Sequence, residues 1–170
     1  MRVGLFDWRN VGGKPASSLL QNGFELMLND LQRSAAGQLL EGGAKWGGTR
    51  RKSRDTATLS LPVPSPRASA KALEGADGVL TGLSASKIWL EMSSSDHQEV
   101  LRLGERVHAL GADALDSPVS GGCHRAATDN IAIFTSGARA AFELALPVLT
   151  TIGGGRCCTL DHWDPPRFSR

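Results

Sequence analysis

Residues 4–30 read GLFDWRNVGGKPASSLLQNGFELMLND, the pattern of a strand, a tight turn, a helix and a second strand that ends in an acid. The two strand signals are short, continuous apolar runs, RVGLF and FELML, as expected of strands covered on both faces. Between them, Ala16, Leu19 and Leu20 share one helical face, and Gly23 marks the helix end. This stretch therefore predicts a βαβ unit with parallel strands.

The turn of this unit departs from the G-x-G-x-x-G pattern of dinucleotide-binding units. In that pattern the glycines allow a tight turn, close approach of the backbone to a pyrophosphate, and close helix–strand packing. The three positions hold Asp7, Arg9 and Gly12. The carboxylate of Asp7 repels an anion, and Arg9 is bulky, although its guanidinium could pair with a phosphate. Asp30 is well placed to bond a ribose hydroxyl. A dinucleotide site and a packing unit without a ligand both remain open on these residues.

Beyond this unit, apolar runs alternate with stretches of helical period, which predicts an α/β fold. We expect further strands over residues 56–62, 87–92 and 130–137, and one that starts at residue 113 and runs into a glycine-rich turn. We expect helices over 34–41, after a loop at 63–70, within 93–111 and over 138–149. Two helices carry apolar stripes expected to face the core: Val100, Leu103, Val107 and Leu110, and Ala141, Leu144, Ala145 and Val148. From Gly153 the periodicity is lost, so we expect one domain over 1–154 and an irregular tail over 155–170.

The composition predicts a globular protein of one domain. The chain has 170 residues, 41% of them hydrophobic and 21% charged, with a net charge of +2. This charge is too small to indicate nucleic-acid binding, and the basic run TRRKSR, residues 49–54, is typical of a solvated loop. No apolar run reaches the roughly 18 residues of a membrane span, and the chain starts directly with a strand, so we expect no membrane association and a cytoplasmic protein. The cysteine spacing favours reduced thiols over disulfides or a metal site.

The segment DSPVSGG, Asp116–Gly122, is a second candidate site. Consecutive glycines after a strand expose backbone N–H groups, which can form a concavity for an anion. Ser120 adds a hydroxyl group that can donate and accept a hydrogen bond. An ordinary turn is the alternative reading of the same residues.

The order of these segments resembles the β-hydroxyacid dehydrogenase family. The resemblance rests on NVGG, ND, SLP, LEMSSSD, DSPVSGG and FELALPVLTTIG, which follow one another at nearly family spacing up to about residue 154. The family includes 3-hydroxyisobutyrate dehydrogenase and tartronate semialdehyde reductases, and its N-terminal domain is similar to that of 6-phosphogluconate dehydrogenase. The resemblance implies a Rossmann-type, doubly wound and mostly parallel sheet. It also implies hydride transfer between a nicotinamide cofactor and a short 3-hydroxy acid.

The same resemblance implies roles for particular residues. Residues matched to cofactor binding are Asn10, Val11, Gly12, Asp30, Leu61, Pro62 and Ser94, and those matched to the substrate carboxylate are Ser120, Gly121 and Gly122. An acid at position 30 suits NAD better than the 2′-phosphate of NADP, so NAD is the expected cofactor. The absence of the fingerprint glycines at positions 7 and 9 predicts that the cofactor binds weakly.

The departures from the family pattern concern activity. The family's catalytic lysine lies beyond the Rossmann domain, on a helix that starts an all-helical second domain, whereas no lysine follows Lys87 here. We therefore assign no catalytic residue and expect an impaired enzyme as a lone chain, with an uncovered apolar face that favours self-association. Two alternatives remain open: a non-catalytic remnant or interaction module that keeps only the fold, and an enzyme completed by another chain.

Overall fold

The computed structural model describes residues 1–6, 13–29, 33–47, 66–76, 78–93, 96–120 and 131–159. Its strands are β1 (Arg2–Phe6), β2 (Glu25–Asn29), β3 (Lys45–Trp46), β4 (Ile88–Glu91), β5 (Asp113–Asp116), β6 (Val119–Ser120), β7 (Ala132–Gly137) and β8 (Cys157–Thr159). Its helices are α1 (Gly13–Gln21), α2 (Gly37–Glu41), α3 (Pro66–Glu74), α4 (His97–His108) and α6 (Arg139–Ile152), with 3-10 turns η1 (Arg33–Ala36) and η3 (Val79–Gly82).

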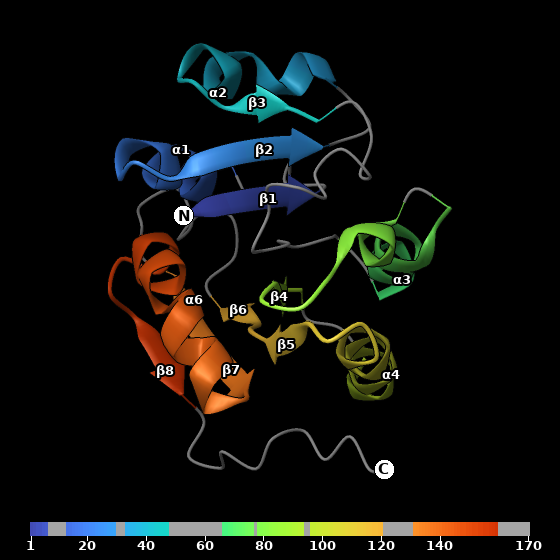
Figure 1. Cartoon of the computed structure of the whole chain (residues 1–170). Helices are drawn as coiled ribbons and strands as arrows, with labels where there is room; N and C mark the ends of the chain where they lie inside the picture. The colour runs from blue at the N-terminus through green and yellow to red at the C-terminus, as the bar shows by residue number, and fades with distance from the viewer. Residues whose placement is uncertain are drawn as a thin grey trace.

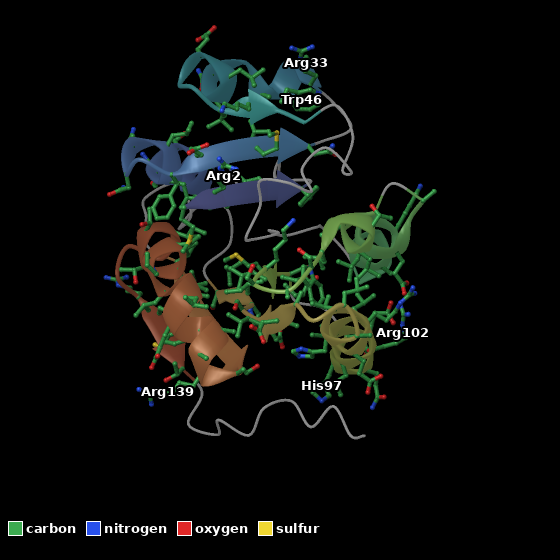
Figure 2. The ribbon with its side chains drawn as sticks, viewed as in Figure 1. Arg2, Arg33, Trp46, His97, Arg102 and Arg139 are labelled. Carbon is green, nitrogen blue, oxygen red and sulfur yellow. The ribbon has the colours of Figure 1, made fainter. Side chains whose placement is uncertain are left out.

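The first βαβ unit is confirmed. β1 and β2 are parallel neighbours, and β3 extends this first sheet on the far side of β2, also in parallel. Gly23 has a φ of +80°, so it ends the α1 segment in the left-handed conformation that glycine adopts without strain. At the amino end of the sheet, Arg2 on β1, labelled in Figure 2, forms an ion pair with Glu25 on β2, with 3.4 Å between Nε and Oε2.

The second sheet is mixed rather than parallel throughout. β4 and β5 are parallel neighbours, in agreement with the mostly parallel sheet that the resemblance implies. β7 runs antiparallel to β5 and also to β6, so the sheet order is β4-β5-β7-β6. The expected single strand ahead of the glycine-rich turn is therefore two short strands, with Ser117 and Pro118 between them. Proline lacks the N–H that a sheet ladder needs, which explains the interruption at this point.

Helices cover both faces of the strands, as in an α/β layer structure. Figure 1 shows α1 and α6 on one side of the molecule and α3 and α4 on the other. The larger core cluster joins the first sheet to the second through Leu5, Leu28, Leu90 and Ile133, together with residues of α1 and α6. A smaller cluster lies under α4 and includes Trp89, Leu103 and Val107. Side chains of neighbouring positions on β4 thus enter different clusters, as the alternation of a strand requires.

The apolar stripe of α6 differs from the prediction at one position. Ala141, Ala145 and Val148 are buried as predicted, but Leu144 is 56% exposed. At about 100° per residue, Ala145, Val148, Leu149 and Ile152 lie within roughly −20° to +80° of Ala141, whereas Leu144 lies at roughly −60°. The buried arc is therefore rotated away from Leu144 toward Leu149, which is fully buried.

The stripe of α4 is also shorter than the prediction. Leu103 and Val107 are buried, and Val100 is partly buried. Leu110 is 42% exposed because the helix ends at His108 and the chain turns at Gly111, whose φ is +76°. Asp96 caps the start of α4, where its side chain accepts a hydrogen bond from the Glu99 N–H at 3.1 Å.

The structure corrects two further element boundaries predicted from the sequence. Residues 157–159 lie in the expected irregular tail but form β8, which pairs in parallel with β7. Side-chain periodicity cannot predict so short an edge strand, because its stability comes from backbone hydrogen bonds to β7. Helix α3 begins at Pro66, inside the expected loop 63–70, since proline is well suited to the first helical position. The expected strand 56–62 and the basic run 49–54 lie outside the described residues.

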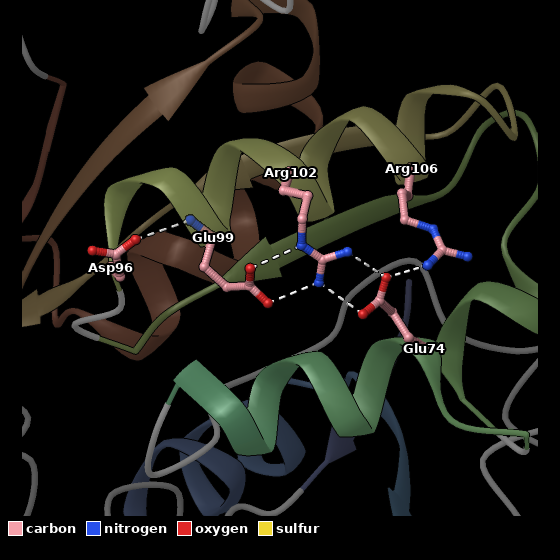
Figure 3. Close-up of polar contacts among 5 residues, drawn as sticks. All are labelled: Glu74, Asp96, Glu99, Arg102 and Arg106. Atoms are coloured by element: carbon pink, nitrogen blue, oxygen red, sulfur yellow. Dashed lines mark hydrogen bonds and ion pairs between the residues drawn. The ribbon is translucent and has the colours of Figure 1, made fainter.

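Charged side chains join α3 to α4. Both oxygens of Glu74 on α3 accept hydrogen bonds from Arg102 on α4, each at 2.7 Å, and Arg106 adds a further ion pair (Figure 3). Arg102 also pairs with Glu99 one turn earlier. The hydrogen bonds from Arg102 hold the pKa of Glu74 at about 2. The network joins the two helices at their exposed surface.

No helix in the described ranges is long and apolar enough to cross a membrane.

Candidate functional site

The carboxyl ends of the parallel strands define the candidate site, because ligands of open α/β sheets bind outside these ends. β1 ends at Phe6 and α1 begins at Gly13, so the turn between them reaches the start of the helix. Unpaired N–H groups at a helix start attract anions, and the first turn of α1 holds no acidic residue. The turn itself, with Asn10, Val11 and Gly12, lies outside the described residues.

The carboxyl ends of β2 and β3 are tied together by Asn29. Its side-chain amide donates a hydrogen bond to the carbonyl oxygen of Gly47 at 2.8 Å. The Gly47 N–H in turn donates to the carbonyl oxygen of Leu28 at 2.9 Å. These two bonds hold the last residue of β2 in place, directly before Asp30, which lies outside the described residues. The sequence pattern does not single out Asn29, because its role depends on a residue 18 positions away.

Two acidic residues end neighbouring strands of the second sheet. Glu91 on β4 and Asp116 on β5 are register partners, so their side chains lie on the same face. Glu91 is buried, and its carboxylate accepts hydrogen bonds from the Ser93 N–H, at 2.9 Å, and from the Ser93 hydroxyl. Asp116 is partly buried, and burial and the nearby charge of Glu91 raise its pKa to about 6, against a smaller opposing effect of His97.

A small cavity lies beside Asp116. Its lining includes Asp116, His97, Trp89 and Ser136, and its volume is about 40 Å³. A buried water needs roughly 10–15 Å³ of such space, so the cavity has room for about three or four waters. Ligand pockets are about tenfold larger. The cavity can therefore hold water beside Asp116 and is too small for a nicotinamide ring.

Two serine residues, Ser117 and Ser120, follow Asp116 and differ in how their hydroxyl groups are placed. The Ser117 hydroxyl is buried and has no hydrogen-bond partner among the residues that the structure describes. Such a group costs free energy unless a water or a ligand atom satisfies it. Ser120 ends β6 and is exposed. This strand end therefore presents one exposed hydroxyl group, that of Ser120.

Ser120 is the one predicted site residue that lies within the described ranges. The others are outside them: Asn10, Val11, Gly12, Asp30, Leu61, Pro62, Ser94, Gly121 and Gly122. Their assignments therefore stay predictions. The structure does place described neighbours of several of them, Phe6, Asn29, Ser93 and Ser120, at the carboxyl ends of strands.

We expect Asp116→Asn to stabilise the fold at neutral pH and not in acid. The folded pKa of about 6 exceeds the ordinary 3.8, so the native state is destabilised as pH rises through this interval. Asparagine stays neutral, so the free energy of unfolding should rise by about 1–2 kcal/mol at pH 8, allowing for the partial exposure of Asp116, and stay unchanged at pH 3.5.

Urea unfolding at the two pH values measures this difference. Asp113→Asn, at the other end of β5, is the matched control for the loss of one carboxylate from the same strand. An equal effect of Asp116→Asn at both pH values would contradict the assignment of the penalty to its buried charge.

The fold and the strand-end site together define a dinucleotide-binding α/β domain. The family described as the NAD binding domain of 6-phosphogluconate dehydrogenase matches residues 3–162, and the chain belongs to this family. It is 25% identical to mouse (Mus musculus) mitochondrial 3-hydroxyisobutyrate dehydrogenase over 152 residues, 89% of this chain and 45% of that protein.

Two further relatives show the same partial coverage. The chain is 30% identical to L-threonate dehydrogenase of Cupriavidus necator over 159 residues, 89% of this chain and 52% of that protein. The crystal structure of 3-hydroxyisobutyrate dehydrogenase from Salmonella typhimurium superposes with a TM-score of 0.82 and 26% identity, over 89% of this chain and 53% of that one. The chain thus spans about half the length of these relatives.

Proposed function

We propose that this chain binds NAD as the cofactor domain of a β-hydroxyacid dehydrogenase-like oxidoreductase. The observation that carries this proposal is the family match over residues 3–162. Bound NAD would supply a hydride acceptor for oxidation of a short 3-hydroxy acid, or NADH a donor for the reverse reduction.

The chain's own residues would bind and orient the two molecules. Asn10, Val11 and Gly12 would wrap the cofactor at the turn before α1, and Asp30, which follows the Asn29–Gly47 bond, would accept a hydrogen bond from the adenosine ribose. Leu61, Pro62 and Ser94 would lie along the rest of the cofactor. Ser120, which is exposed at the end of β6, would with Gly121 and Gly122 hold the substrate carboxylate.

We further propose that the lone chain is impaired in turnover. Hydride transfer at a hydroxyl group needs an acid–base partner for the proton, and loss of such a group costs about 10²–10⁴-fold in rate. No lysine follows Lys87 in this chain. Self-association through an exposed apolar face also stays a prediction; the exposed apolar side chains of α6, Leu144 and Leu146, lie roughly 160° apart around the helix and do not form one face.

A second candidate function is a non-catalytic module that keeps the fold without the dinucleotide. The observation that favours it is the presence of Asp7 and Arg9 where the fingerprint has glycine. Both side chains would occupy the approach of the backbone to the pyrophosphate. The two functions differ in whether the purified chain binds NAD at all, which calorimetry with NAD and NADP measures.

Restoring the glycines tests the role of the turn. The double variant Asp7→Gly, Arg9→Gly should bind NAD at least about tenfold more tightly, because a repelling carboxylate and a bulky side chain are both removed. The control Arg2→Gln, Glu25→Gln removes one charge of each sign at the amino end of the same sheet, and should leave NAD binding unchanged. If the double glycine variant binds no more tightly than the parent chain, the turn does not limit affinity.

A further inference from the structure

A row of polar side chains crosses three strands of the second sheet at the start of α4. Glu91 and Asp116 are register partners on β4 and β5, and Asp116 and Ser136 are register partners on β5 and β7. Neighbouring strands lie about 4.8 Å apart, and the side chains of register partners share a face. The two carboxyl groups are therefore adjacent on one face of the sheet, and the proposed cofactor site does not use them.

The face that carries this row is the one that α4 covers. Trp89 and Ala114, two residues before Glu91 and Asp116, belong to the smaller core cluster under the helix. A cavity of about 40 Å³, lined by both Asp116 and His97, lies at the strand ends. His97 is the exposed first residue of α4, and Figure 2 shows its side chain on the side of the helix toward β5. The start of α4 thus meets the sheet across a cavity that can hold water, whereas the middle of the helix packs through apolar side chains.

The charge of the row changes with pH at Asp116. Among the described residues, Glu91 on β4 and His97 on α4 are the titratable groups that act on the Asp116 carboxyl group. Its partner on β7, Ser136, is neutral. Burial and the Glu91 carboxylate raise the pKa of Asp116 to about 6, and His97 lowers it. Glu91 is buried and accepts a hydrogen bond from the Ser93 N–H, so it cannot move away from Asp116 without breaking that bond.

We propose that Glu91, Asp116 and His97 form a proton-operated switch that closes the start of α4 on the sheet in acid and loosens it at neutral pH. In acid, a proton on Asp116 leaves one negative charge on the acidic pair, and the imidazolium of His97 lies opposite it. As pH rises, Asp116 loses this proton, and two adjacent carboxylates repel each other in a partly buried place. Histidine loses its charge near neutral pH, so the cation that offsets this repulsion is lost as well. Movement of the start of α4 away from the sheet admits water to the pair and relieves the repulsion.

The direction of the pH dependence follows from the two states of Asp116. In the closed state its pKa is about 6, and a carboxyl group that has returned to water has the ordinary value of 3.8. The closed state therefore loses stability as pH rises from about 4 to about 6, and it does not regain that stability at higher pH. Loss of the charge of His97 further favours the open state.

Amide hydrogen exchange on the whole chain tests the switch. In the first turn of α4, the Val100 N–H donates to the Asp96 carbonyl oxygen at 3.0 Å, and at the other end Ala109 donates to Glu105 at 2.9 Å. After correction for the intrinsic pH dependence of exchange, the opening equilibrium at Val100 should rise roughly tenfold from about pH 4.5 to about pH 7.5, allowing for the partial exposure of Asp116. The opening equilibrium at Ala109 should change by less than roughly threefold.

Four variants assign the effect to particular side chains. Asp116→Asn keeps the shape without the charge, so the rise at Val100 should disappear. Ser136→Ala, the matched control, changes an uncharged residue of the same cavity and should keep the rise. NMR of the Asp116 carboxyl group measures the coupling directly. Glu91→Gln should lower its titration midpoint and His97→Gln should raise it, because each removes one of the two charges that act on it.

A rise at Val100 that persists in Asp116→Asn would overturn the switch, and so would a parent chain whose opening at Val100 does not change with pH. A titration midpoint of Asp116 that stays unchanged in either Glu91→Gln or His97→Gln would overturn the three-residue unit. These measurements need no bound cofactor, so a negative result leaves the proposed function unaffected.

Discussion

Gly137→Ala is expected to lower the free energy of unfolding by about 3–4 kcal/mol, the combined cost of backbone strain and overpacking. Gly137 ends β7 opposite Leu115 of β5, and its φ is +140°, a region that residues with a Cβ rarely adopt. An added Cβ would lie 2.6 Å from Leu115 Cδ2 and 2.9 Å from the Ala114 carbonyl oxygen. The first atom belongs to a fully buried side chain and the second to the backbone, so neither can move away easily.

Thermal unfolding measures this effect as a fall in Tm on the order of 10 °C for a chain of this size. Gly37→Ala is the control, because no atom lies within 4 Å of an added Cβ there and Gly37 begins α2. Alanine is a better helix former than glycine, so this control should keep or slightly raise the Tm. A Gly137→Ala variant as stable as the parent would show that β5 and β7 are not held as closely as the structure has them.

Leu149→Ala is the second large effect, an expected loss of about 3 kcal/mol from the removed side chain and the cavity left behind. Leu149 is fully buried on the side of α6 that faces the larger core cluster, to which α1 also contributes. Leu144→Ala on the same helix is the matched control. Leu144 is 56% exposed, so its loss should change stability by less than about 0.5 kcal/mol.

Urea unfolding of both variants measures the difference between them. The two substitutions have the same chemistry and the same helix propensity change, so only burial distinguishes them. A larger loss of unfolding free energy for Leu144→Ala than for Leu149→Ala would mean that α6 is rotated relative to the structure. The buried face would then be the one predicted from the sequence, which includes Leu144. The experiment therefore tests the orientation of α6 as well as its stability.

The sequence alone identifies residues of the candidate site only where they belong to a local motif. The motif DSPVSGG and the acid at position 30 can be recognised because each is contiguous or directly follows a strand. Asn29 and Glu91 cannot be recognised in this way. Their partners are Gly47, directly after β3, and Asp116 on β5, and the distances to them depend on strand pairing and register.

What the sequence by itself determined is the family, the α/β class and the existence of β1, α1, β2, β4, α4, β7 and α6, but not of β3, η1 or the break between β5 and β6. These features depend on apolar period and glycine signals, which are local properties of the chain. The tertiary structure alone decided the antiparallel direction of β7, the pairing of β8, the buried arc of α6 and the shared environment of Glu91 and Asp116. The physical reason is that backbone hydrogen bonds, helix rotation and desolvation depend on which distant segments pack together. The local periodic pattern of the sequence does not specify that packing.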